Sequence, residues 1–181
     1  LSECVLGIAH PSHTLTIKGD YNLRPITAIL QTMLKCDNAL SRDEMILGPL
    51  SVSSDRTERD ISNIASRVHD FRRHPDELNA AMSELTNARG VKKNSFGNYT
   101  RWPIAVMRDL GWTTKDKISY RELNKTFQVH RLTDLGEAIA YRVSNSADLR
   151  ADQVDTLPTQ YKSALAFTAH YYILERSGFD I

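Results

Sequence analysis

A basic segment that contains no acidic residue runs from residue 89 to residue 101. Arg and Lys side chains neutralise phosphates, and amide and hydroxyl groups donate hydrogen bonds to phosphate oxygens. The segment is therefore a candidate contact with a nucleic-acid backbone, and the alternative is a solvated interdomain loop. Its candidate residues are Arg89, Lys92, Lys93, Asn94, Asn98, Tyr99 and Arg101.

A second set of candidate side chains shares one face of a helix that we expect to begin at Thr57. Asn63 and Arg67 are one helical turn apart on this face. Asn fits the edge of adenine and Arg the edge of guanine in a major groove, so the helix could read bases. An ordinary exposed helix carries the same mixture, and both interpretations stay open. Close to this pair lie Arg59, Ser66 and Arg73.

The residues that metal-dependent or nucleophilic catalysis requires are not found in a familiar pattern. Many metal-dependent nucleases place an acidic residue two positions before a catalytic Lys, so that both side chains share one strand face. No Lys of this chain has Asp or Glu two positions earlier, and no glycine-rich phosphate loop is present. His10 and His13 have no cysteine or acidic cluster with zinc spacing beside them. We therefore expect no catalytic residue, no metal site and no cofactor in this chain, although a dispersed site is not excluded by sequence.

Composition limits the remaining function classes. The formal net charge of the 181 residues is +1, so any nucleic-acid binding must come from local patches rather than from an overall basic field. The two cysteines, Cys4 and Cys36, lack a metal-type spacing and favour a reducing compartment, which predicts a cytoplasmic protein. No apolar run is long enough to span a bilayer, so we expect no membrane association.

The first half of the chain predicts helices. Pro25 suits a first helical turn, and apolar residues at helical spacing follow it up to Leu34. Ser41 and Glu44 form a capping box before a short helix that Gly48 stops. Further helices should start at Thr57 and at Pro75, the latter closing at Gly90, and residues 14–17 are compatible with a short strand.

The second half predicts a helix, a hairpin and two more helices. A short helix over residues 102–110 should end at Gly111. Residues 118–121 and 126–131 should pair as a hairpin, on which Lys115, Lys117 and Lys125 are candidate phosphate contacts. Thr133 then caps a helix that follows the strand at once, in a Leu-Thr-x-x-Gly junction. A last helix should cover residues 159–176.

These elements predict a mainly α protein of the α+β class, built from two winged-helix-like subdomains with short hairpin wings. We place the subdomains at residues 1–92 and 93–181, because residues 89–100 have no strong periodicity. A hairpin that leads into a short apolar helix is common at the wing of winged-helix DNA-binding domains.

Three short motifs resemble a known family. They are Leu23-Arg24-Pro25-Ile26, the stretch from Leu40 to Met45, and Phe71-Arg72-Arg73. Together with the hairpin junction they resemble the recognition region of FokI- and AlwI-type restriction endonucleases, over residues 20–145. The resemblance implies tandem winged-helix subdomains that read an asymmetric DNA site, while a separate domain cuts.

The sequence thus predicts sequence-specific binding of double-stranded DNA by the recognition portion of a type II, type IIS-like restriction endonuclease. Cleavage would need a separate nuclease domain, in the same or another chain, and a divalent cation such as Mg²⁺. The alternatives are a winged-helix transcription regulator and a helical protein-interaction module.

Overall fold

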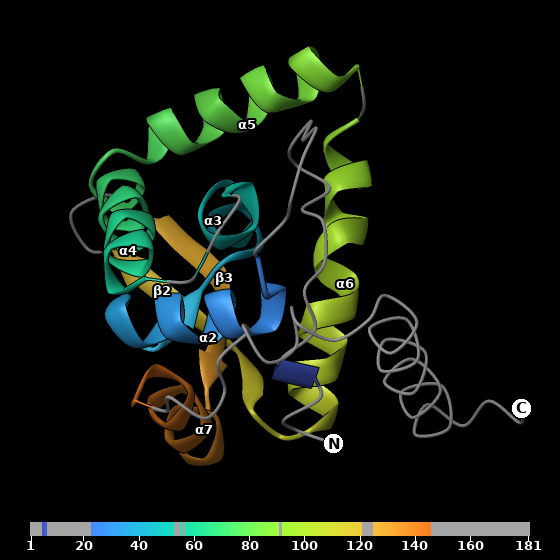
Figure 1. Cartoon of the computed structure of the whole chain (residues 1–181). Coiled ribbons are helices and arrows are strands. Elements are labelled where there is room, and N and C mark those ends of the chain that lie inside the picture. Colours follow the sequence, from blue (N-terminus) through green and yellow to red (C-terminus); the bar gives the residue numbers. More distant parts are fainter. Residues whose placement is uncertain are drawn as a thin grey trace, which may run out of the picture.

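The chain is mainly helical and has one small antiparallel sheet, which confirms the predicted α+β class (Figure 1). The computed structural model describes residues 5–6, 23–52, 55, 57–90, 92–120 and 125–145. Its elements are α2 (Pro25–Lys35), β1 (Ala39–Leu40), α3 (Arg42–Leu47), the 3-10 turn η1 (Pro49–Ser51), α4 (Glu58–Arg73), α5 (Pro75–Arg89), α6 (Lys93–Asp109), β2 (Thr113–Tyr120), β3 (Lys125–Leu132) and α7 (Asp134–Asn145).

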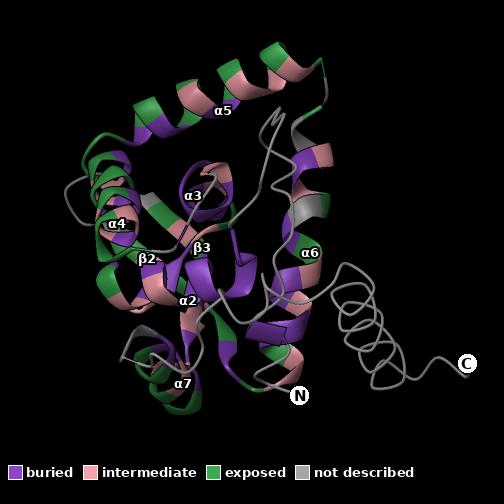
Figure 2. Cartoon of the chain, viewed as in Figure 1, coloured by how far each residue is buried: buried purple, intermediate pink, exposed green. Residues whose placement is uncertain are grey.

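The helices around the sheet differ in position and in how far they are buried. In Figure 1, α2 and α3 lie in front of β2 and β3, and α5 arches over the top from α4 to α6. Figure 2 shows that α2 and α3 are largely buried, whereas α5 exposes most of its surface. The sheet order is β1-β3-β2, so the two-residue strand β1 pairs with the second strand of the hairpin.

The predicted helix starts at two side-chain caps and the predicted stops at two glycines are confirmed. Ser41 Oγ accepts from the Glu44 amide at 3.2 Å, and Glu44 Oε2 accepts from the Ser41 amide at 2.6 Å. Thr57 caps α4 in the same way, with Asp60 as the reciprocal partner. Gly90 and Gly111 follow α5 and α6 with φ of 62° and 73°, a conformation that glycine adopts without a steric penalty.

The expectation that residues 89–100 lack helical periodicity and that a helix begins only at Trp102 was wrong. Helix α6 begins at Lys93, nine residues earlier. Phe96, Thr100, Ile104 and Met107 recur at helical spacing and are buried. Polar neighbours and two poor helix formers, Gly97 and Pro103, mask this period in the sequence.

The predicted hairpin is confirmed but is longer than expected and belongs to a single sheet. Strand β2 begins at Thr113, and its pairing with β3 continues from Thr113 opposite Leu132 to Tyr120 opposite Lys125. Only one sheet occurs in the described part of the chain. The predicted strand at 14–17, the hairpin residues 121–124 and the predicted helix at 159–176 lie outside that part.

One hydrophobic cluster draws on both sides of the predicted boundary at residues 92 and 93. Ile29 and Met33 of α2 pack in it with Met107 of α6, Leu132 of β3 and Val143 of α7. A smaller cluster joins α3 to α5 and to Phe96 of α6. The division into two subdomains stays a prediction, but the described residues of the two parts share a core. A second hairpin does not occur among the described residues before residue 93.

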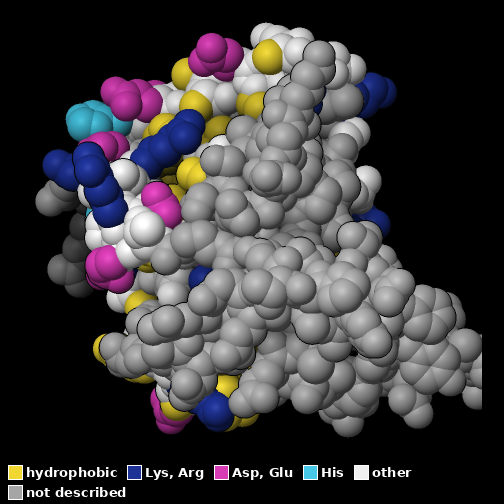
Figure 3. Space-filling model, viewed as in Figure 1, with side chains coloured by type: hydrophobic (Ala, Val, Ile, Leu, Met, Phe, Trp, Pro, Cys, Tyr) yellow, Lys and Arg dark blue, Asp and Glu magenta, His cyan; other side chains and the backbone are white. Residues whose placement is uncertain are grey.

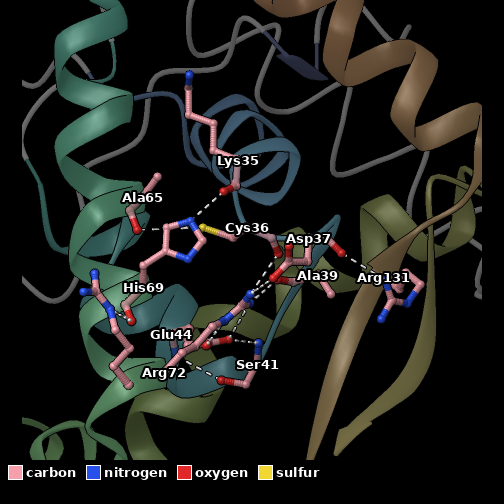
Figure 4. A network of polar contacts seen from close by, with 11 residues as sticks. Lys35, Cys36, Asp37, Ala39, Ser41, Glu44, Ala65, His69, Arg72 and Arg131 are labelled. Carbon is pink, nitrogen blue, oxygen red and sulfur yellow. Dashed lines mark hydrogen bonds and ion pairs between the residues drawn. The ribbon is translucent and has the colours of Figure 1, made fainter. Parts of the chain in front are cut away.

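The buried side chain of Arg72 joins four segments of the first half (Figure 4). Its Nε donates to Glu44 Oε1 at 2.7 Å, and its Nη atoms donate to the Cys36 carbonyl at 3.0 Å and to the Ala39 carbonyl at 2.6 Å. Nη1 also donates to Asp37 Oδ2 at 3.0 Å. The side chains of Arg72 and Glu44 are each 7% exposed, so this is a buried ion pair with its hydrogen bonds satisfied.

The junction between β3 and α7 depends on a glycine. Thr133 donates its amide to the Trp112 carbonyl at 3.0 Å, and its Oγ1 accepts from the Gly136 amide at 3.1 Å. This arrangement brings Gly136 so close to Trp112 that an added Cβ would lie 1.8 Å from the Trp112 carbonyl oxygen. The glycine of the Leu-Thr-x-x-Gly junction is therefore required by contact between two backbones.

We predict that Arg72→Met lowers the free energy of unfolding by about 3–5 kcal/mol, because it leaves the Glu44 carboxylate buried without its cation. The neighbouring Arg73 is a matched control, since its exposed side chain pairs with Asp70 and donates to the His69 carbonyl on the surface. Arg73→Met should cost less than about 1 kcal/mol. Urea unfolding of both variants measures the difference, and equal losses would contradict the assigned role of Arg72.

We also predict that Gly136→Ala destabilises the protein by about 1–3 kcal/mol through the clash with Trp112. Gly97→Ala is the control, because nothing lies within 4 Å of an added Cβ at that position of α6. It should instead stabilise the protein by about 0.5–1 kcal/mol, since alanine is the better helix former. Thermal or urea unfolding that ranks the two variants in the opposite order would refute this assignment.

Candidate nucleic-acid interface

Two of the three predicted lysines of the hairpin lie on one face of the sheet, whereas the backbone register assigns residue 125 to the other face. Lys115 pairs with His130 and Lys117 pairs with Gln128, and directly paired residues project to the same side. Lys115, Lys117 and Gln128 are exposed, whereas His130 is buried. The opposite face carries Phe127 and Val129, which line a crevice against α4 and the start of α5.

These four side chains line a surface hollow of about 470 Å³ together with Arg42, the first residue of α3. We call this site the basic hollow and define it by Arg42, Lys115, Lys117, Gln128 and His130. Asp116 also borders it, but the Asp116 carboxylate accepts from Arg131 Nε and from the Lys117 amide. These two hydrogen bonds, with that of Arg131 the stronger, hold the pKa of Asp116 below its usual value.

Helix α6 leads into the hairpin and carries further polar and basic side chains. Asn98, Arg101 and Arg108 of this helix are exposed, whereas Phe96 and Met107 are buried, and the spacing places Asn98 and Arg101 away from the buried side. The C-terminal end of α6 leads through Gly111 into β2, so Arg108 lies next to the hairpin. We call the exposed face of α6 and the basic hollow together the α6–hairpin surface.

Three cations of this part of the molecule, Arg42, Lys115 and Arg108, act on the ring of His130. Burial is the largest cause that lowers the pKa of His130, and the positive charges of Arg42, Lys115 and Arg108 lower it further. Arg108 is partly neutralised, because its guanidinium donates to Asp109 at 2.9 and 3.0 Å. Arg42, Lys115 and Lys117 form no ion pair with any other residue that the structure describes.

The predicted residues of the basic segment are divided between two helices. Arg89 ends α5 and is half-buried, while Lys92 is exposed just before α6. The backbones of Lys93, Asn94 and Tyr99 belong to α6. Of this segment, Asn98 and Arg101 are the described side chains that lie on the α6–hairpin surface.

The second predicted set lies on α4, in mixed electrostatic surroundings. Arg59, Asn63, Ser66, Arg67 and Arg73 are all exposed. The Arg67 guanidinium lies over the Phe71 ring, 5.6 Å from its centroid, and Arg73 pairs with Asp70 at 3.0 Å. Figure 3 shows basic and acidic side chains intermingled over α4.

The lysines of the hairpin and the predicted residues of α4 do not form one surface. Phe127 and Val129 face the α4–α5 corner, and strand alternation directs Lys115 and Lys117 to the other side of the sheet. The structure therefore brings Lys115 and Lys117 together in the basic hollow, and Asn63 and Arg67 lie on α4.

Sequence reasoning missed four residues of this surface: Arg42, Arg108, Gln128 and His130. In the sequence, Arg42 lies in a predicted helix start and in a motif of the family resemblance, and Arg108 lies in a predicted short helix. The alternation of Gln128 and His130 with apolar residues was a usable signal, because it assigns both to the face of the predicted lysines. The contribution of Arg42 had no local signal, since it depends on β1 pairing beside the hairpin.

The motifs that carried the family resemblance have structural roles in this chain. Arg24 donates from its amide and its Nε to the buried Asp55 carboxylate, each at 3.0 Å. Glu44 and Arg72 form the buried pair described above. Comparisons with protein families, characterised proteins and solved structures found no match, so the resemblance stays a prediction.

Two further findings concern the described residues alone. None of their helices is both long and apolar enough to cross a membrane. No group of three or more His, Cys, Asp or Glu side chains among them is placed to hold a metal ion.

We predict that His130 titrates below its ordinary pKa of 6.5. Because the unfolded chain then binds the proton more tightly, the free energy of unfolding should decrease as pH falls below 6.5, until the folded pKa is reached. Titration of the ring resonances by NMR gives the midpoint, and urea unfolding across this pH range gives the slope. His130→Gln should reduce the slope. A midpoint at or above 6.5 would contradict the positive surroundings assigned to this ring.

Proposed function

We propose that this chain binds double-stranded DNA sequence-specifically through the α6–hairpin surface. The observation that supports this most directly is the convergence of α3 and the β2–β3 hairpin on one exposed hollow. Its cations Arg42, Lys115 and Lys117 form no ion pair with any other described residue. Such local convergence supplies the phosphate contacts that a net charge of +1 does not suggest.

The connectivity supports a winged-helix arrangement with an insertion. A helix, a short strand and a second helix (α2, β1, α3) are followed later by a helix and a hairpin (α6, β2, β3), and the sheet order is β1-β3-β2. Helices α4 and α5 would be the insertion. In this arrangement the helix that leads into the hairpin enters the major groove, and the hairpin contacts the adjacent backbone.

Helix α6 exposes side chains suited to reading bases. Asn98 and Arg101 are three residues apart on its outer face, where Asn can pair with adenine and Arg with guanine in a bidentate manner. On α4, by contrast, Arg67 packs on Phe71 and Arg73 pairs with Asp70. We therefore place base reading on α6 and keep Asn63 and Arg67 of α4 as the alternative surface.

The biological setting is a part of this proposal. We propose that the chain is the recognition portion of a type II restriction endonuclease, in the cytoplasm, with a separate Mg²⁺-dependent nuclease domain. This rests on the resemblance in the three short motifs. A transcription regulator would use the same surface, and DNA cleavage by a longer native chain that includes these residues would distinguish the two.

The test begins with selection of a preferred duplex from randomised sequences. Asn98→Ala and Arg101→Ala should then each weaken binding to that duplex by about 1–3 kcal/mol and weaken binding to scrambled duplexes much less. Asn63→Ala and Arg67→Ala are the matched comparison on α4. All four residues are exposed, so the melting temperature should stay close to that of the unaltered protein.

The variants that lose affinity for the preferred duplex show whether α6 or α4 reads the bases. Loss confined to the α4 variants would move base reading to α4 and refute the role of α6. Failure of the selection to enrich any duplex would refute sequence-specific binding itself.

A further inference from the structure

We propose that the basic hollow binds backbone phosphates of a nucleic-acid strand and so fixes the position of the protein on DNA without reading bases. The inference deepens the proposed function and rests on it for the identity of the polymer. It concerns Arg42, Lys115, Lys117, Gln128 and His130.

The geometry of the hollow brings donors together from separate elements. The pairs Lys115–His130 and Lys117–Gln128 lie side by side on adjacent strands, and Arg42 reaches the same hollow from α3. Directly opposite residues in an antiparallel pair have Cβ atoms about 4.5–5.5 Å apart, so both lysines and Gln128 can donate to the same anion.

The charges of the hollow favour an anion. Arg42, Lys115 and Lys117 have no carboxylate partner in the part of the chain that the structure describes. The one acidic residue on the rim, Asp116, is held by Arg131, which also donates to the Asp37 carbonyl at 2.9 Å. An anion that enters the hollow therefore meets cations that have not been neutralised.

The lining of the hollow favours a polymer backbone over a small enclosed ligand. Pockets that enclose small molecules are mostly apolar, with a few polar groups that orient the ligand. Here nearly all of the lining residues are charged or polar, and Arg42, Lys115, Lys117 and Gln128 are exposed. Contacts of this kind position a protein on a nucleic acid and carry no sequence information.

His130 offers a reporter inside the site. It is buried at the base of the hollow, and the charges of Arg42, Lys115 and Arg108 disfavour its protonated form. A bound phosphate would oppose those charges and would raise the pKa of His130. The ring therefore reports occupancy independently of any DNA-binding assay.

The first arm of the test compares Arg42→Gln with Lys115→Gln, as a double variant, against the unaltered protein. We expect affinity to fall by a similar factor for preferred and scrambled duplexes, and the slope of log affinity against log salt to decrease by about two units. Arg59→Gln with Arg73→Gln is the matched control, because it removes two exposed arginines of α4. This control should leave the slope unchanged.

The second arm follows the His130 resonances by NMR as inorganic phosphate is added, with chloride at equal ionic strength as the control. Phosphate should raise the titration midpoint in the unaltered protein and not in the double variant. A mononucleotide that binds in the hollow as tightly as a duplex of random sequence would overturn the assignment to a polymer backbone.

The outcomes distinguish the proposed phosphate site from the proposed sequence-specific binding of DNA. An unchanged salt slope and affinity in the folded double variant would overturn the phosphate site, whatever the protein binds. A loss confined to the preferred duplex would also overturn it, because it would indicate base reading. If phosphate and random duplexes bind through the hollow but selection yields no preferred sequence, the phosphate site stands and sequence-specific recognition fails.

Discussion

The buried ion pair between Arg72 and Glu44 is the constraint on which the arrangement of the first half depends. Glu44 closes the capping box of α3 and at the same time accepts from Arg72 of α4. Arg72 also satisfies the carbonyls of Cys36 and Ala39, at the turn between α2 and β1. A buried pair of this kind contributes little net stability compared with apolar packing, but it excludes arrangements that would leave either charge unpaired. We infer that it sets the position of β1, and β1 is the strand against which the hairpin pairs.

The hairpin pairs with β1 and carries most of the residues of the basic hollow. Strand β3 pairs with β1 on one side and with β2 on the other, and each face of the sheet has a different use. One face turns Phe127 and Val129 toward the corner of α4 and α5. The other presents Lys115 and Lys117 beside Arg42. Because side chains alternate strictly along a strand, burial of the apolar set on one face directs the lysines to the other. The inward position of Phe127 and Val129 and the exposure of Lys115 and Lys117 are thus two results of one register.

The Arg residues of the chain show how little residue type alone says about function. Arg24 and Arg72 are buried in ion pairs and hold the fold together. Arg131 bridges Asp116 and the Asp37 carbonyl, and Arg73 has a surface partner. Arg42 and Arg101 are exposed and stay available for a partner. A guanidinium serves equally well as a structural fork and as a phosphate or base contact, so only its surroundings distinguish the two uses.

Local chemistry determined those helix boundaries that carry a side-chain cap, a first-turn proline or a following glycine. The Ser41 and Thr57 caps, the proline at the start of α2 and the glycines after α5 and α6 act over a few residues, and their effects could be read directly. The α+β class also followed from hydrophobic periodicity. Only the tertiary structure decided the rest. The early start of α6 depends on Phe96 and Thr100 finding a core, which polar neighbours conceal in the sequence. Strand β1 is two residues long and is formed only through its pairing with β3. The basic hollow combines residues 42, 115 and 128, and no local pattern can indicate that residues so far apart in the chain meet, because their proximity is set by strand register and helix packing.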